Sequence, residues 1–86
     1  MNTEIKQKLP KWFNGEVYKK GDTVKNRFSK EEFKLNEIEL SMYDFIIGAT
    51  LVVEMGIRND KIINDLQKGL GWFKENNIKA YMALLD

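Results

Sequence analysis

Few residue types in this chain could carry out chemistry. Its 86 residues contain no Cys and no His, which excludes disulfides, thiol nucleophiles, Cys/His zinc sites and histidine acid–base steps. Asp44 is the acid that could still donate a proton, because it lies in a strongly apolar stretch where burial would raise its pKa. An Asp44 that faces solvent, or that pairs with a cation such as Arg58, would have no such role. We therefore expect no catalytic residue and no enzymatic activity.

Phosphate-binding and metal-binding motifs are also missing from the sequence. The glycine pair of Lys68-Gly-Leu-Gly lies inside a helical pattern, with no strand before it and no Lys-Ser/Thr after it, so it is not a phosphate-binding loop. Glu31-Glu32 and the pair Asp60 and Asp65 are too sparse to hold a cation. The sequence predicts neither a cofactor nor a metal site.

Three glycines within the helical patterns need a reason, since glycine costs about 1 kcal/mol relative to alanine inside a helix. They are Gly48, Gly69 and Gly71. We expect them to permit close approach of neighbouring helices. The alternative is a surface left open for a flat ligand.

Cations and aromatic rings are mixed in the first third of the chain. Residues 1–35 hold nine Lys and Arg against five Asp and Glu, a net charge of +4, whereas residues 36–86 have a net charge of −3. Single-stranded nucleic acids bind to cations through phosphates and to aromatic rings through bases. The nucleic-acid candidates are Lys11, Lys19, Lys20, Lys25 and Arg27. A core also needs aromatic residues, and lysines protect edge strands, so we treat nucleic-acid binding as an alternative function.

The spacing of apolar residues changes at Asn36. Over residues 9–35 it predicts a β-hairpin or a three-stranded meander, with strands near 16–19, 23–26 and 32–35 and a single helical turn near Pro10. We expect one domain over 1–86, comprising a flexible N-terminal segment over 1–8, an extended part over 9–35 and a helical part over 36–86.

Two or three helices are predicted after residue 36. The first begins after Asn36, with Glu39 placed for a capping box, and ends near Met55 before Gly56. The second begins after the N-cap Asn59. A third, short helix follows Asn76-Asn77 and is expected to close the core with Ile78, Tyr81, Met82 and Leu85.

The first of these helices is apolar on nearly every side, which is typical of a core helix or an interface helix. A small chain without disulfides gains stability by association, and exposed apolar and Arg residues are frequent binding hot spots. We therefore expect a non-enzymatic protein-interaction or self-assembly module, a dimer or larger. The interaction candidates are Trp12, Phe13, Arg27, Phe28, Ile47 and Leu51.

No membrane association is expected from the sequence. The uncharged run from Phe45 to Val53 is closed at both ends by Asp44 and Glu54, whereas a span requires roughly 20 apolar residues. The N-terminal residues show no signal-peptide pattern. These features predict a cytoplasmic protein.

Most of the chain resembles one known family. The resemblance rests on the segments Leu9-Pro-Lys-Trp-Phe-Asn-Gly-Glu-Val-Tyr, Lys20-Gly-Asp-Thr-Val-Lys-Asn-Arg-Phe-Ser, Glu39-Leu-Ser-Met-Tyr-Asp-Phe-Ile, Lys68-Gly-Leu-Gly-Trp-Phe-Lys-Glu-Asn-Asn and Tyr81-Met-Ala-Leu-Leu-Asp. In these segments the chain is similar to small proteins of unassigned function from marine cyanophages and ocean metagenomes. The resemblance implies a phage or marine microbial origin and a host-cell cytoplasmic location, and it transfers no catalytic residue, ligand or partner. A host or virion protein is then a candidate partner beside a second copy of the chain.

The fold expected from these patterns is α+β. An N-terminal hairpin or meander packs on two or three C-terminal helices, because a lone hairpin is marginally stable in water.

Overall fold

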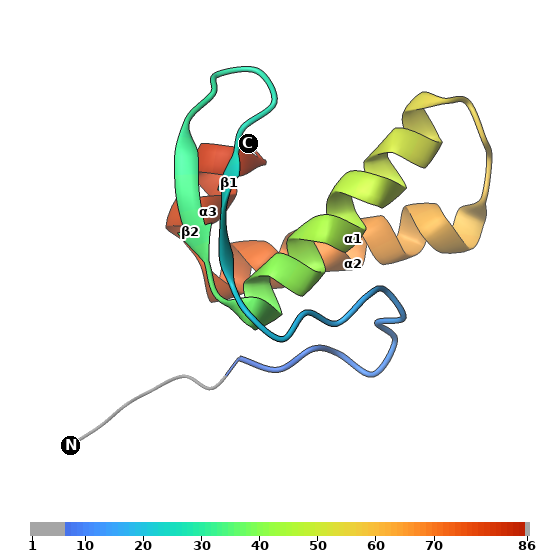
Figure 1. Cartoon of the computed structure of the whole chain (residues 1–86). Coiled ribbons are helices and arrows are strands. Elements are labelled where there is room, and N and C mark those ends of the chain that lie inside the picture. The colour runs from blue at the N-terminus through green and yellow to red at the C-terminus, as the bar shows by residue number, and fades with distance from the viewer. Residues whose placement is uncertain (1–6, 86) are drawn as a thin grey trace.

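The computed structural model describes residues 7–85 and has the expected α+β architecture (Figure 1). An antiparallel hairpin of β1 (Asp22–Lys25) and β2 (Glu32–Leu35) precedes three helices. These are α1 (Glu37–Glu54), α2 (Asp60–Asn76) and α3 (Ile78–Leu84). In Figure 1, α1 rises away from the base of the hairpin, α2 returns along it, and α3 lies against the hairpin.

The extended part forms a hairpin and not a meander. Val24 pairs with Phe33 across the two strands, and both side chains are half-buried on the face toward the helices. Leu35, two residues further along β2, is buried, as the alternation of apolar and polar residues predicts. The third strand expected over residues 16–19 does not form, because the backbone N–H of Tyr18 donates to Ser41 Oγ (2.8 Å) on α1.

The ends of α1 follow the sequence closely. Asn36 Oδ1 accepts from the backbone N–H of Glu39 (2.8 Å), and Glu39 Oε1 accepts from the backbone N–H of Asn36 (3.1 Å), which completes the capping box. At the other end Gly56 has φ +84°, and the N–H of Ile57 donates to the carbonyl of Val52 (3.3 Å). This is the left-handed helix ending for which glycine is favoured.

The apolar face predicted for α3 is only partly right. Asn77 caps the helix by accepting from the N–H of Ala80 (3.1 Å). Ala80 and Leu84 are buried, whereas Ile78 and Met82 are 46% and 61% exposed. The small Ala80 side chain allows α3 to lie close to the core, which turns the two larger residues outward.

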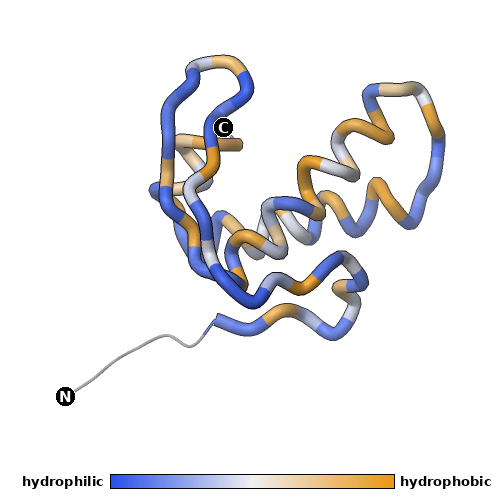
Figure 2. The backbone as a smooth tube through the Cα atoms, in the orientation of Figure 1, coloured by the Kyte–Doolittle hydropathy of each residue, from blue (hydrophilic) through white to orange (hydrophobic). Residues whose placement is uncertain are grey.

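The core lies where the three helices and β2 meet. Its fully buried large side chains are Leu35, Met42, Ile46 and Phe73. A Cβ at Gly69 would lie 3.2 Å from Met42 Sδ and 3.3 Å from Ile46 Cγ1, so this glycine does allow α2 to approach α1. The same expectation is wrong for Gly48 and Gly71, which have nothing within 4 Å of a Cβ. Figure 2 shows hydrophobic segments recurring along the helices and long hydrophilic segments in the hairpin.

The N-terminal segment crosses the base of the helices without regular structure. The backbone carbonyl of Lys8 accepts a hydrogen bond from Trp72 Nε1 (3.0 Å), and Gln7 Nε2 donates to Glu39 Oε2 (2.8 Å). Pro10 and Phe13 close the expected single turn through a hydrogen bond of 3.1 Å. The flexible segment expected over 1–8 lies, for residues 1–6, outside the described residues.

Candidate functional site

Asn26 makes the side-chain hydrogen bonds that shape the hairpin tip. Its Oδ1 accepts from the backbone N–H groups of Phe28 (2.7 Å) and Ser29 (3.0 Å), and Lys30 completes the loop with φ +67°. The Nδ2 of Asn26 donates to the carbonyl of Ala83 (2.9 Å) in α3. A single side chain thus shapes the loop and fixes it to the last helix.

The two residues after Asn26 project from this loop. Phe28 is 81% exposed, although phenylalanine is among the residues most often buried. The guanidinium of Arg27 lies 5.0 Å from the centre of the Phe28 ring and 3.2 Å from Glu54 Oε2 on α1. Arg27 therefore spans the space between the hairpin tip and α1. The pair is largely exposed, so it contributes at most about 1 kcal/mol to stability.

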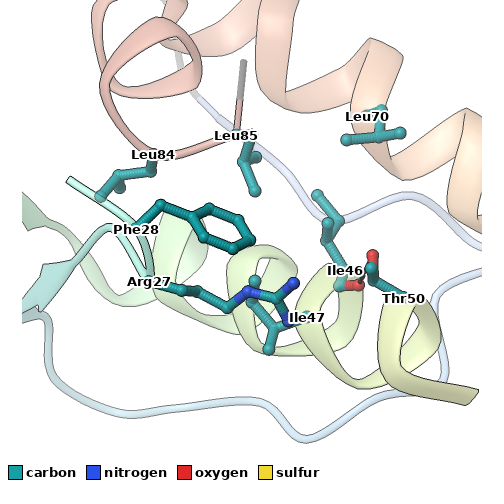
Figure 3. Close-up of a pocket in the computed structure, with 8 residues that line it drawn as sticks. All are labelled: Arg27, Phe28, Ile46, Ile47, Thr50, Leu70, Leu84 and Leu85. Carbon is teal, nitrogen blue, oxygen red and sulfur yellow. Dashed lines mark hydrogen bonds between the residues drawn. The ribbon is translucent and has the colours of Figure 1, made fainter. Parts of the chain in front are cut away.

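A pocket of about 230 Å³ lies beneath this span. Figure 3 shows its walls: Arg27 and Phe28 from the hairpin tip, Ile46, Ile47 and Thr50 from α1, Leu70 from α2, and Leu84 and Leu85 at the end of α3. The walls are mainly aliphatic, and the Thr50 hydroxyl already donates to the carbonyl of Ile46 (2.7 Å). For comparison, a dry cavity of about 150 Å³ holds one benzene molecule. The hairpin-tip pocket therefore suits one apolar side chain.

The structure brings together part of the interaction set predicted from sequence. Arg27, Phe28 and Ile47 line the pocket, and Leu51, which is 46% exposed, lies one turn beyond Ile47 on α1. Trp12 and Phe13 lie elsewhere and pack against Phe45, with ring centres 5.8 Å from it in each case. Sequence reasoning missed Ile46, Leu70, Leu84 and Leu85, whose convergence depends on how the helices dock and has no local signal.

One of the nucleic-acid candidates, Arg27, lies against an exposed aromatic ring, that of Phe28. Trp12 and Phe13 face Phe45, and Phe28 is the one exposed aromatic residue within residues 7–85. Lys25 lies 3.7 Å from Glu32, and Arg27 is paired with Glu54. Lys11, Lys19 and Lys20 are exposed on the N-terminal segment. One cation beside one exposed ring is less than the series of rings on which successive bases stack in single-strand binding proteins.

Asp44, the candidate buried acid, is exposed. The alternative of a solvent-facing side chain is therefore the correct one, because this position of α1 lies outside the core. Its neighbour is Tyr18, whose pKa is raised above its ordinary value by desolvation and by the negative charges of Asp44 and Glu16.

The two buried carboxylates have structural partners. Glu39 accepts from Gln7, Asn36 and Asn77, which ties the N-terminal segment, α1 and the α2–α3 junction together. Asp65 pairs with Lys61 (2.6 Å) one turn earlier on α2. Both carboxylates therefore have partners within the fold.

Within residues 7–85, no three acidic residues gather as a metal site would require, and no helix is long and apolar enough to cross a membrane. No protein-family model, curated protein or solved structure matches the chain. The functional argument therefore rests on the geometry of the hairpin-tip pocket.

Proposed function

We propose that this protein is a non-enzymatic interaction module that assembles with a second copy of itself through the hairpin-tip pocket. Its place of action in this proposal is the cytoplasm, that of the host cell if a phage encodes it. The observation that carries the proposal is the Phe28 ring, which is 81% exposed on a loop fixed by Asn26, at the rim of an apolar pocket. An exposed aromatic side chain on a hydrogen-bonded loop is a common form of binding anchor.

The Phe28 side chain and the hairpin-tip pocket lie on the same face of the molecule, so this face is complementary to the same face of a second copy. In a two-fold dimer the same patch of both copies meets, so each anchor must lie near its own pocket. Phe28 meets this condition because it forms one wall of the pocket. A symmetry axis passing near the two Phe28 rings would place each ring in the other copy's pocket, and a volume of about 230 Å³ accommodates it.

Neighbouring apolar residues enlarge the surface. Ile47 is half-buried and Leu51 is exposed on the same side of α1, one turn apart. Covering such residues would remove apolar area from water at about 25 cal/mol per Å². A domain of this size buries only roughly 60–65% of its unfolded surface by itself, so association adds burial that the single chain lacks.

The test is the mass in solution, measured by light scattering after size exclusion for the wild type and two surface variants. Phe28→Asp places a charge where the anchor enters the pocket, and we expect it to convert a dimer into a monomer. Val17→Asp is the matched control, since Val17 is also exposed, at 64%, but lies outside the pocket. We expect Val17→Asp to remain a dimer. Circular dichroism checks that both variants fold.

A monomeric wild type at about 100 μM would contradict the proposal, as would a Phe28→Asp variant of unchanged mass. The same run at low and high salt, with the 260/280 nm absorbance ratio recorded, covers the alternative function. Nucleic acid carried at low salt and released at high salt would instead assign the function to the basic N-terminal part. A monomer that captures a purified host or virion protein through Phe28 would replace the second copy as the partner.

A further inference from the structure

A larger hollow lies on the opposite side of α1. This groove has a volume of about 410 Å³ and is lined by Asn14, Asp44, Phe45, Gly48, Ala49, Val52 and Ile62. At 3.6 residues per turn, positions 44, 45, 48, 49 and 52 lie on the helix side away from positions 46, 47 and 50, which line the hairpin-tip pocket. The α1 groove is therefore separate from the proposed dimer surface, and its volume falls in the range of ligand sites.

Gly48 in the floor of this groove has no structural reason within the chain. It lies inside α1, where glycine destabilises a helix relative to alanine. A Cβ there would meet no atom within 4 Å, and the residue has no positive φ that would require glycine. Its effect is to leave the helix backbone open beneath the groove, which permits close approach of another molecule.

One end of the groove is negatively charged. Asp44 is exposed at this end, and among residues 7–85 no Lys or Arg nitrogen lies within 4.0 Å of its carboxylate. The remaining walls are apolar apart from Asn14. This combination is complementary to a cation attached to an apolar group.

We infer that the α1 groove binds a segment of a partner protein that presents a Lys or Arg side chain next to a bulky apolar one. The cation pairs with Asp44, and the apolar side chain lies over Gly48 between Phe45, Val52 and Ile62. The inference does not depend on the proposed dimer, because the two hollows use different faces of α1.

The experiment is an NMR titration of the whole ¹⁵N-labelled chain with the peptide acetyl-Phe-Lys-amide. Acetyl-Phe-norleucine-amide, which lacks the charge, and acetyl-Phe-Glu-amide, which reverses it, are the ligand controls. We expect shifts centred on the amides of Gly48, Val52 and Ile62. Binding of the Lys peptide should be about two- to fivefold tighter than that of the norleucine peptide, as for an exposed ion pair. Binding of the Glu peptide should be the weakest.

Two variants separate charge from shape. Asp44→Asn should remove the preference for Lys while leaving the norleucine peptide unaffected. Gly48→Met fills the floor and should weaken both peptides at least about tenfold. Gly71→Met is its control, because Gly71 is also a helix glycine with open space around it but does not line the groove. Shifts that map elsewhere, equal binding of the three peptides, or unchanged binding to Gly48→Met would overturn the inference.

Repeating the titration with Phe28→Asp tests whether peptide binding depends on dimerisation. Unchanged peptide binding by this variant supports a groove independent of assembly, whether or not the wild type is a dimer. Loss of binding by this variant would show that a second copy completes the groove, and a fall in wild-type mass on adding the peptide would show that a second copy occupies it. Either result would overturn the inference.

Discussion

At the level of single residues, two glycines in this chain have opposite surroundings. A Cβ at Gly21 would lie 2.1 Å from the carbonyl oxygen of Leu35 and 2.8 Å from Asn36 Cα. These are backbone atoms, which cannot rotate away as a side chain does. Gly48, by contrast, has open space where its side chain would be. The same substitution at the two positions should therefore change stability in opposite directions.

We predict that Gly21→Ala lowers the free energy of unfolding by about 2 kcal/mol, since the β1 end must move away from the β2–α1 junction. Gly48→Ala should raise it by up to about 1 kcal/mol, because alanine is the better helix former. Urea unfolding followed by circular dichroism measures both. If both variants change the free energy of unfolding in the same direction, the surroundings described for Gly21 or for Gly48 are wrong.

Tyrosine ionisation gives the stability a pH dependence. Burial raises the pKa of Tyr43 above its ordinary value, and the charge of Arg27 lowers it by a smaller amount. The folded state therefore holds the phenolic proton more tightly than the unfolded state. The resulting stability is complete below the unfolded pKa of about 10 and is lost as pH rises through the higher folded value.

We expect the free energy of unfolding to fall as pH rises from about 9.5 to 11. Tyr43→Phe should reduce the slope of this fall, because phenylalanine has no proton to lose. The variant should cost little at neutral pH, since the Tyr43 hydroxyl lies a long 3.5 Å from the Lys25 carbonyl. Urea titrations at several pH values measure the slopes, and equal slopes for the two proteins would refute the expectation.

At the level of elements, α1, α2 and α3 each have an asparagine as the N-cap residue. Asn36, Asn59 and Asn77 each accept a hydrogen bond from the N–H three residues later. Glu39 links two of these caps, since its Oε1 accepts from the Asn36 backbone and its Oε2 from Asn77 Nδ2 (2.9 Å). The start of α1 and the start of α3 are therefore stabilised by the same carboxylate.

Glu39→Ala should lower the free energy of unfolding by about 3 kcal/mol, because it leaves the donors of Asn36 and Asn77 without their acceptor and Gln7 with only the long 3.4 Å bond to the Asn76 carbonyl. Glu39→Gln keeps one acceptor and should cost less than half as much. Thermal and urea unfolding of both variants provide the comparison. Equal losses for the two would show that the charge, and not the hydrogen bonding, matters at this position.

These caps also show what could be predicted from sequence. Helix starts, the Gly56 ending and the hairpin depend on residues within a few positions of each other. The helix starts and the ending are confirmed, and the hairpin is the correct one of the two alternatives that the sequence left open. The outward face of α3 and the missing strand at residues 16–19 depend on distant partners, Ser41 among them. The candidate site was predicted only in part for the same reason. Arg27, Phe28 and Ile47 can be chosen as interaction candidates from their residue types alone. The pocket itself forms only where the hairpin tip and the three helices meet.

For the whole molecule, α1 separates two hollows of different character. The hairpin-tip pocket is small and apolar beside an exposed aromatic residue, and the α1 groove is larger with a carboxylate at one end. Because they lie on opposite sides of one helix, a dimer formed through the first leaves the α1 side of the second uncovered. Each copy in the proposed assembly could thus bind a partner segment of its own.

Asn77 has a further consequence for how the molecule opens. Its backbone N–H donates to the carbonyl of Phe73 at the end of α2, while its side chain caps α3 and donates to Glu39. A helix of seven residues has no stability of its own in water. We expect the amide protons of α3 to exchange with solvent as slowly as those of α2, through one shared opening of the structure. Hydrogen exchange measured by NMR tests this, and early exchange confined to α3 would show that the last helix detaches alone.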